Sequence, residues 1–402
     1  MTTALRNYLI ITSSYWAFTI TDGAIRMLVV LYFHLLGYSP FEVAMLFLFY
    51  EFFGIVTNLV GGWLGSRIGL NLTMHIGMSL QVIALALLMA PENYLTVAYV
   101  MFAQALSGIA KDLNKMSAKA SIKTLLPQGD NDSTLFKWVA ILTGSKNALN
   151  GLGFFVGALL MQWLDFRTAL GILSGSLFFV LIASVILLPA GLGKAKIKPK
   201  FTQIFSKTPA INYLSSARFF LFGSRDVWFV VALPVYLYSV FEWNFMQVGG
   251  FLASWIIGYG IVQSLVPKLI QRSHQLAPDA NTAKYWAFIL CFIPAAIALG
   301  LMFKFNPQLI LMIGLIIFGI VFAINSAVHS YLIVAFSDKD KVSMNVGFYY
   351  MANAGGRLTG TILSGWVYQT QGLEACLWLS SIFVLIAALL STKINTQNKY
   401  NI

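Results

Sequence analysis

Eight ionisable side chains interrupt the long apolar stretches of this 402-residue sequence. An ionised group at the centre of a bilayer costs about 2.5–3.5 kcal/mol, so eight of them facing lipid would cost about 20–28 kcal/mol. That exceeds the whole stability of an ordinary domain. We therefore expect them to face one another or a wet central cavity. They are Asp22, Arg26, Glu51, Lys146, Arg218, Arg225, Asp226 and Arg357.

Basic groups outnumber acidic groups in this set by five to three. Arginine stays protonated even when it is partly desolvated, and its guanidinium binds carboxylate, phosphate or arsenate through two parallel hydrogen bonds. The surplus of positive charge therefore predicts a binding site for an anion.

Helical spacing brings some of these charges together. Asp22 and Arg26 are four residues apart and Arg218 and Arg225 are seven apart, so each pair shares one helix face. Salt bridges that only fix helix packing are the alternative for Asp22 with Arg26 and for Arg225 with its neighbour Asp226.

Glu51, in the stretch FLFYEFFGIVTN, has no basic residue within one helical turn. A buried carboxyl group without a partner is expected to carry a proton near neutrality. Glu51 is therefore either a proton carrier or a protonated hydrogen-bond donor.

Four lysines recur every four residues and are expected to form a basic stripe at the cytoplasmic mouth of the protein. They are Lys111, Lys115, Lys119 and Lys123. Such a stripe would anchor to anionic lipid headgroups or guide an anionic solute toward the protein.

The composition is that of a membrane protein, because 58% of the residues are hydrophobic and only 10% are charged. The net charge of +12 does not indicate nucleic-acid binding, since the positive charge lies between apolar spans. Two cysteines inside apolar segments indicate neither a disulfide framework nor a metal site. We expect no cofactor, and no motif of a nucleophile, metal or P-loop enzyme is present, so the chain is not expected to be an enzyme.

Twelve apolar spans predict an all-α membrane protein built from two six-helix bundles around a central cavity. The spans lie at about 8–36, 41–65, 72–90, 94–114, 136–161, 167–189, 210–240, 246–267, 285–303, 308–335, 342–368 and 373–391. The predicted domains are residues 1–190, a lysine-rich linker at 191–208, and residues 209–402. An offset of 204 residues pairs Asp22 with Asp226 and Phe18 with Phe222, as two parallel repeats would.

The basic residues predict the orientation of the chain. Nineteen lysines and arginines fall on the side of the two termini, whereas the opposite loops hold only Arg167 and Lys304. By the positive-inside rule both termini are expected in the cytoplasm.

The stretch GGWLGSRIG, Gly61 to Gly69, resembles the signature of the major facilitator superfamily in the loop between its second and third spans. Ser66 stands where that family usually has aspartate. The resemblance implies the fold of that family and a gating loop that contains Gly62, Gly65, Arg67 and Gly69.

A narrower resemblance rests on four stretches of the N-terminal half. They are YWAFTITDGAIRMLVVLYFHLLGYSP, LFLFYEFFGIVTNLVGGWL, GIAKDLNKMSAK and GSKNALNGLGFFVG. These stretches are similar to bacterial organoarsenical exporters of the ArsJ type. The resemblance implies efflux of 1-arseno-3-phosphoglycerate across the bacterial inner membrane, and therefore arsenate resistance. It also implies a functional partner, a glyceraldehyde-3-phosphate dehydrogenase that makes this ester and need not touch the exporter.

The predicted anion site combines cations with amides one helical turn away. Its members are Arg225, Arg357, Arg26, Lys146, Arg218, Asn150 and Asn353. We expect Arg225 and Arg357 to hold the anionic groups, with help from Arg26 or Lys146. The two aspartates of the set would hold the arginines when the site is empty. An exporter of another organic anion or of a drug is the alternative function, and we expect a monomer.

Overall fold

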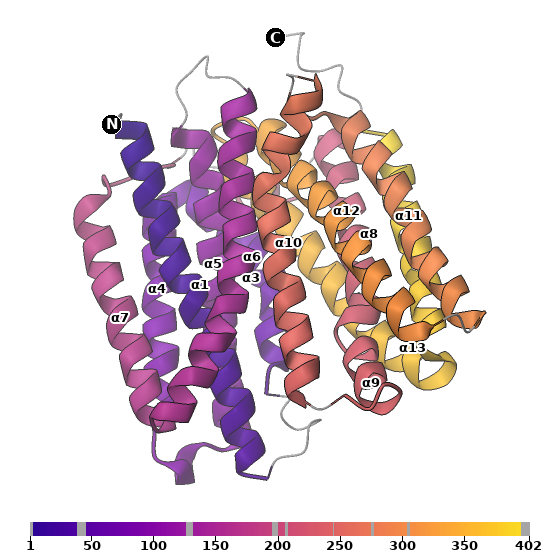
Figure 1. The fold of residues 1–402 in the computed structure, drawn as a ribbon. Helices are drawn as coiled ribbons and strands as arrows, with labels where there is room; N and C mark the ends of the chain where they lie inside the picture. Colours follow the sequence, from indigo (N-terminus) through magenta and orange to yellow (C-terminus); the bar gives the residue numbers. More distant parts are fainter. Residues whose placement is uncertain are drawn as a thin grey trace. The chain divides into compact units, whose positions relative to one another are not determined.

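The computed structural model describes residues 3–37, 46–125, 132–194, 200–205, 208–243, 245–274, 277–303 and 306–394. Apart from two short 3-10 turns, the regular elements within these ranges are α-helices (Figure 1). Their bounds are α1 Thr3–Leu35, α3 Leu48–Ile68, α4 Leu70–Leu88, α5 Val97–Leu125, α6 Asp132–Trp163, α7 Phe166–Leu187, α8 Pro209–Phe229, α9 Ala232–Ser239, α10 Phe245–His274, α11 Ala280–Met302, α12 Pro307–Ala335 and α13 Val342–Thr392.

Polar caps and glycines mark where several helices begin and end. The Asp165 carboxylate accepts hydrogen bonds from the first backbone amides of α7, and Asp279 forms a capping box with Thr282 on α11. Gly372, with a φ of 82°, divides α13 into two helices, since this backbone conformation is accessible chiefly to glycine.

The helices are long enough to cross a bilayer. Seven stretches are also apolar enough over their length to cross a membrane by themselves. They are α4, α7, α8 with α9, α10, α11, α12 and α13. The charged helices α1, α3, α5 and α6 have 33, 21, 29 and 32 residues, and about 20 residues suffice to span the hydrocarbon core. With α13 counted as two helices, the described residues contain twelve stretches of membrane-spanning length.

The outer surface of the helices is apolar. On α7, Phe179 and Ile186 are 73% and 75% exposed, and on α13 Trp366 is 64% exposed. Large apolar side chains that point outward along a whole helix are expected where lipid, rather than water, covers the helix.

The residues cluster into two compact units. Unit 1 comprises Met1–Asp130, Ser145–Phe205 and Ser337–Met351, and unit 2 comprises Asn131–Gly144, Ser206–Phe336 and Ala352–Ile402. Helix α6 thus begins in unit 2, and α13 begins in unit 1. The predicted domain boundaries at a 191–208 linker stay a prediction, and 195–199 and 206–207 lie outside the described residues.

In unit 1, helix α5 packs against α3, α4 and α1, while α7 packs against α1 and α4. The apolar core of this unit includes Ile25, Leu28 and Phe33 from α1 and Leu85 and Leu88 from α4, all less than 1% exposed.

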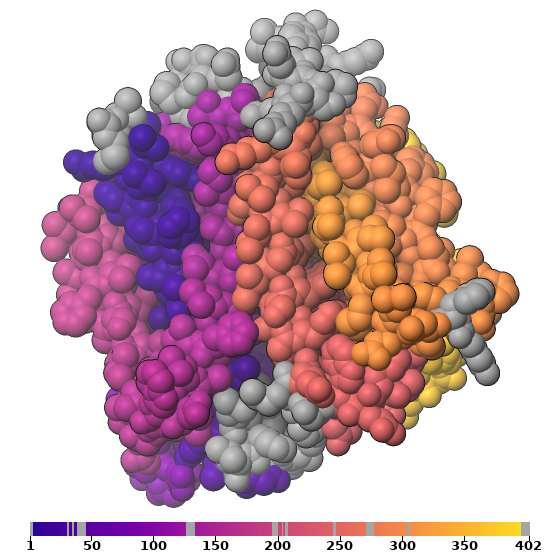
Figure 2. Space-filling model, in the orientation of Figure 1, coloured from indigo at the N-terminus to yellow at the C-terminus, as the bar shows by residue number. Residues whose placement is uncertain are grey.

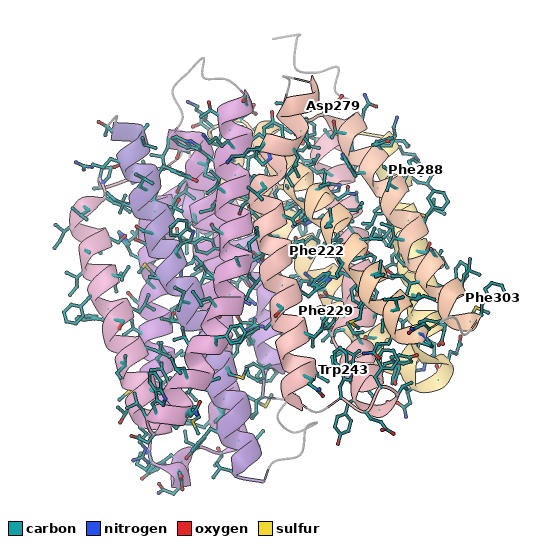
Figure 3. All side chains as sticks on the ribbon, in the orientation of Figure 1. Phe222, Phe229, Trp243, Asp279, Phe288 and Phe303 are labelled. Carbon is teal, nitrogen blue, oxygen red and sulfur yellow. The ribbon has the colours of Figure 1, made fainter. Side chains whose placement is uncertain are left out.

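In unit 2, helix α12 packs against α8, α10 and α11, and Figure 2 shows α10 and α12 side by side. Asp279 and Phe303 cap the two ends of α11, and on α8 Phe222 lies in the aromatic core with Phe229 packed against it (Figure 3). The ring of Trp228 contacts Trp255 and Phe318 edge-on at 6.0 and 5.0 Å.

Two features of unit 1 differ from the sequence prediction. Helix α5 continues to Leu125 instead of ending near residue 114, because Met116, Ala118 and Ala120 bury an apolar face alongside the lysines. The signature GGWLGSRIG belongs to α3 rather than to a loop, and Gly69 alone, with a φ of 105°, forms the turn to α4.

Glycines let helices of each unit approach closely, as the small-residue pattern of the sequence suggested. In unit 1, a Cβ atom at Gly153 of α6 would lie 2.6 Å from the backbone oxygen of Ile20 on α1. In unit 2, a Cβ atom at Gly356 of α13 would overlap the backbone oxygen of Phe219 on α8.

These contacts predict opposite outcomes for two substitutions in α13. Gly356→Ala should destabilise the purified protein by about 1–3 kcal/mol, because the methyl group meets rigid backbone. Gly365→Ala, where a Cβ meets nothing within 4 Å, should leave the protein unchanged or stabilise it through helix propensity. Thermal unfolding in detergent measures both, and equal melting temperatures would contradict the close approach of α8 and α13.

Candidate functional site

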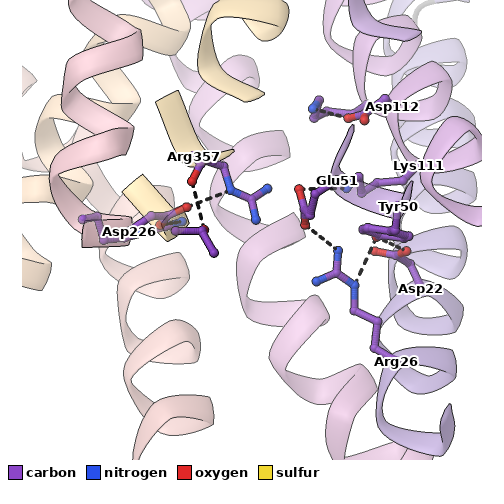
Figure 4. A network of polar contacts seen from close by, with 11 residues as sticks. Asp22, Arg26, Tyr50, Glu51, Lys111, Asp112, Asp226 and Arg357 are labelled. Atoms are coloured by element: carbon purple, nitrogen blue, oxygen red, sulfur yellow. Dashed lines mark hydrogen bonds and ion pairs between the residues drawn. The ribbon is translucent and has the colours of Figure 1, made fainter. Parts of the chain in front are cut away.

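Tyr50 of α3 organises the charged side chains in unit 1 (Figure 4). Its hydroxyl donates a hydrogen bond to Asp22 Oδ1 at 2.6 Å and accepts one from Arg26 Nε at 3.1 Å. Its ring lies 4.1 Å from the guanidinium carbon of Arg26 and 3.7 Å from the ammonium of Lys111. Tyr50 thus links the acid and the base that the sequence placed on one face of α1.

Glu51 lies between two cations. Its carboxylate is 3.5 Å from Arg26 Nη2 and 3.9 Å from Lys111 Nζ. Its own helix supplies no basic residue within one turn, as the sequence shows, but the expectation that Glu51 is an unpaired carboxyl group is wrong, because its partners come from α1 and α5. The reason for expecting a proton on this carboxyl group therefore does not hold.

The lysines of α5 line the inside of unit 1. Lys111 and Lys119 are 7% and 1% exposed, and Lys115 forms an ion pair with the buried Asp112. The ring of Tyr350, in the first part of α13, lies 4.3 Å from Lys115 Nζ and 5.2 Å from Lys119 Nζ. The expectation that these three lysines anchor to lipid headgroups is wrong, because they are packed against aromatic rings and acids, and their position at the cytoplasmic mouth stays a prediction.

Two arginines of unit 2 share one carboxylate (Figure 4). Asp226 is 0% exposed, and its Oδ1 accepts from Arg225 Nε at 2.7 Å, with Arg225 Nη2 at 2.5 Å. Its Oδ2 accepts from Arg357 Nε at 3.1 Å. The guanidinium groups are more accessible than the acid, since the side chains of Arg225 and Arg357 are 16% and 29% exposed.

A third arginine, Arg218, is more deeply buried in unit 2. It is 2% exposed and donates to Asn353 Oδ1 at 2.8 Å and to Ser326 Oγ at 3.1 Å. The ring of Phe222 lies 3.8 Å from the guanidinium carbon of Arg218 and 5.1 Å from that of Arg225. A phenyl ring thus contacts both cations of this helix face, as the ring of Tyr50 does in unit 1.

The other predicted site residues lie elsewhere in unit 1. Lys146 and Asn150 are half-buried on α6. Gly62 packs against the start of α13, where Ser343 Oγ donates to its backbone oxygen at 2.6 Å. Gly65 is buried beside Ser343, and the guanidinium carbon of Arg67 lies 5.0 Å from the ring of Trp63.

Sequence reasoning missed the aromatic partners of the cations. Phe222 follows Arg218 by four residues and precedes Arg225 by three, so helical spacing alone was a usable signal. The contacts of Tyr50 with α1 and α5 join residues up to 61 positions apart, and no local pattern indicates them.

The comparisons with known proteins identify the family. The sequence profile described as Major Facilitator Superfamily matches residues 9–278 and 281–399, which is almost the whole chain. The chain belongs to the major facilitator superfamily. No curated protein sequence matches it significantly.

Solved structures of several membrane transporters have the same fold. The human organic anion transporter MFSD10 superposes with a TM-score of 0.76 at 14% identity, covering 97% of this chain and 100% of that one. A bacterial homologue of the iron transporter ferroportin, in an outward-facing state, gives 0.78 at 13% identity, covering 98% and 99%. The Escherichia coli fucose:proton symporter FucP gives 0.73 at 12% identity, covering 98% and 100%.

Membership of the major facilitator superfamily confirms the predicted all-helical fold. The protein is a multi-pass membrane protein and a secondary transporter of a small substrate, not an enzyme. Identities of 12–14% establish the shared fold and leave the substrate to be inferred from the charged networks.

The geometry around Tyr50 predicts that its hydroxyl and its ring contribute separately. Tyr50→Phe keeps the ring beside both cations but leaves Asp22 and Arg26 without their shared hydroxyl, which should cost about 1–3 kcal/mol of stability. Tyr50→Leu removes the ring as well and should lower the melting temperature further. Tyr94→Phe, at a residue that is 61% exposed, is the control. Equal melting temperatures for Tyr50→Phe and the unsubstituted protein would contradict a structural role for the hydroxyl.

Proposed function

We propose that this transporter exports an anionic organoarsenical, 1-arseno-3-phosphoglycerate, and so confers resistance to arsenate. The observation that carries the proposal is the charge balance of unit 2. Arg218 and Arg225 contact the ring of Phe222, and Arg225 and Arg357 share the carboxylate of Asp226, so three cations and one acid meet in this part of the described chain. A network with more cations than acids attracts anions and repels cations, which argues against a cationic drug as substrate.

The sequence resemblance to ArsJ-type exporters supports the identity of the anion. The ester carries a phosphate and an arsenate group, and guanidinium groups bind such oxyanions with paired hydrogen bonds. A glyceraldehyde-3-phosphate dehydrogenase would supply the ester from arsenate and act as a functional partner without touching the transporter. Another organic anion is the alternative that the same charge balance supports.

Substrate binding would proceed by exchange of carboxylates. In the empty site, Asp226 holds Arg225 and Arg357. An incoming oxyanion would take over one or both guanidinium groups, so that substrate replaces an internal acid as their partner. Because a ligand shifts a conformational equilibrium only through its different affinity for two states, this exchange would link loading to the transport motion.

Replacing arginine with lysine tests this site while keeping its charge. Arg225→Lys and Arg357→Lys lose the two-pronged geometry, and the loss of a hydrogen bond to a charged group, about 1.5–3 kcal/mol, should slow transport roughly ten- to a hundredfold. Uptake of the ester into everted vesicles, with and without a proton gradient, measures the rate.

Arg167→Lys, at an exposed arginine in the first turn of α7, is the matched control and should transport normally. Both site variants must insert at normal levels. If they then export the ester at the unsubstituted rate, the site is wrong. If the unsubstituted protein exports other phosphate esters but not this one, the proposed substrate is wrong.

We also propose that the protein lies in the bacterial inner membrane with both termini in the cytoplasm. The excess of basic residues in the connections on the side of the termini supports this orientation. A C-terminal fusion to a reporter that is active only in the cytoplasm should therefore be active. Activity of a C-terminal alkaline phosphatase, which works only outside, would reverse the orientation.

A further inference from the structure

The connection between α7 and α8, residues 188–208, is basic and takes no part in the proposed anion site. Its sequence contains five lysines and no aspartate or glutamate. Among the described residues of this connection, Lys194 and Lys200 are both exposed. The connection joins two stretches that can each cross a membrane, Phe166–Leu187 and Pro209–Ser239, so it lies at the level of the lipid headgroups.

Two large apolar side chains are exposed on the same connection. Phe201 is 55% exposed and Phe205 is 58% exposed. Water alone satisfies an exposed lysine, but an exposed phenyl ring gains free energy only when an apolar phase covers it. Lysines next to large apolar side chains are the combination with which protein segments bind the boundary between headgroups and acyl chains.

The aromatic part of the connection is packed on unit 1. The ring of Phe201 meets the ring of Trp63 on α3 edge-on at 5.2 Å. The ring of Phe205 meets that of Phe348, in the first part of α13, edge-on at 6.2 Å. Ile204 between them is 6% exposed. Each phenyl ring therefore has a fixed position and still presents more than half of its surface.

The beginning of the connection is also fixed on unit 1. The backbone oxygen of Leu192 accepts a hydrogen bond from the backbone amide of Leu70, at the start of α4, at 2.8 Å. At the end of α7, Arg6 Nη2 of α1 donates to the backbone oxygen of Leu187 at 3.3 Å. Arg6 is exposed and adds a cation close to this connection. A segment held in this way loses little conformational freedom when a ligand binds to it.

We propose that this connection is a binding site for phospholipids with an anionic headgroup. Lys194 and Lys200 attract the headgroup, and Phe201 and Phe205 insert at the upper ends of the acyl chains. Anionic lipids are favoured over zwitterionic lipids because the connection carries positive charge and no acid that would offset it. This role is independent of the transported substrate.

A fluorescent label on the connection tests the proposal. The two cysteines of the chain are buried, so Thr202→Cys, at an exposed position between the two phenylalanines, can be labelled selectively. The full-length protein is placed in vesicles of phosphatidylcholine and phosphatidylglycerol, with bromine on the acyl chains of one lipid or the other. Bromine quenches the label on contact. Brominated phosphatidylglycerol should quench it more strongly than brominated phosphatidylcholine.

Substitutions separate the two parts of the site. Lys194→Gln together with Lys200→Gln should lower the relative affinity for phosphatidylglycerol roughly tenfold, and high salt should have a similar effect. Phe201→Ser together with Phe205→Ser should instead weaken quenching by both lipids and leave the preference for phosphatidylglycerol in place. All four side chains are exposed, so these variants should fold normally.

Two controls separate a local site from the net charge of the protein. Lys268→Gln together with Lys393→Gln removes the same charge from exposed positions of unit 2 and should leave the preference at Thr202→Cys unchanged. A label at Lys339→Cys, between the acids Asp338 and Asp340, should show no preference for phosphatidylglycerol.

Three results would overturn the proposal. Equal quenching of the label at Thr202→Cys by the two lipids would show that the connection does not select anionic headgroups. Quenching by neither lipid would show that it lies away from the bilayer, where another part of the chain or a partner protein covers the phenyl rings. Loss of the preference in the unit 2 control variant would show that net charge alone produces it.

Discussion

The structure depends on one constraint: a charge inside a low-polarity interior must be met by an opposite charge or by oriented dipoles. Each unit meets it in the same way. Two cations lie against one aromatic ring, Tyr50 with Arg26 and Lys111 in unit 1 and Phe222 with Arg218 and Arg225 in unit 2. Carboxylates and hydroxyl groups accept hydrogen bonds from the N–H groups of these cations. In unit 2 the electron-rich face of Phe222 lets two arginines lie close together with Asp226 as the acid of this cluster, whereas in unit 1 Arg26 and Lys111 are matched by Asp22 and Glu51.

Helix spacing makes these contacts possible. Glycines on α6 and α13 bring those helices against the backbones of α1 and α8, which carry Asp22 and Asp226. The side chains that meet at each network come from three or four helices, so small changes in helix separation would pull several partners apart at once. Close packing by small residues and the pairing of buried charges therefore support each other.

Much of this was predictable from sequence. Apolar length identified the spans, and the cost of buried charge identified Asp22, Arg225, Asp226 and Arg357 as members of networks, because both signals are local. Partners from other helices were not predictable. Glu51 looked isolated because Arg26 and Lys111 reach it across helix interfaces. The lysine-rich end of α5 was predicted to lie in a loop, because hydropathy registers the charge of the lysines. It does not register the aromatic rings and acids of other helices that contact them.

The way in which Asp226 is bound affects how easily its two arginines can exchange this carboxylate for another anion. Its two oxygens are bound by different arginines, Oδ1 by Arg225 and Oδ2 by Arg357. Either arginine can therefore leave while the other still neutralises the acid. The two arginines can therefore leave Asp226 one after the other. In the intermediate the carboxylate still has one arginine as its partner. A single arginine holding both oxygens would instead have to release them together, which would make the empty state slow to admit any ligand.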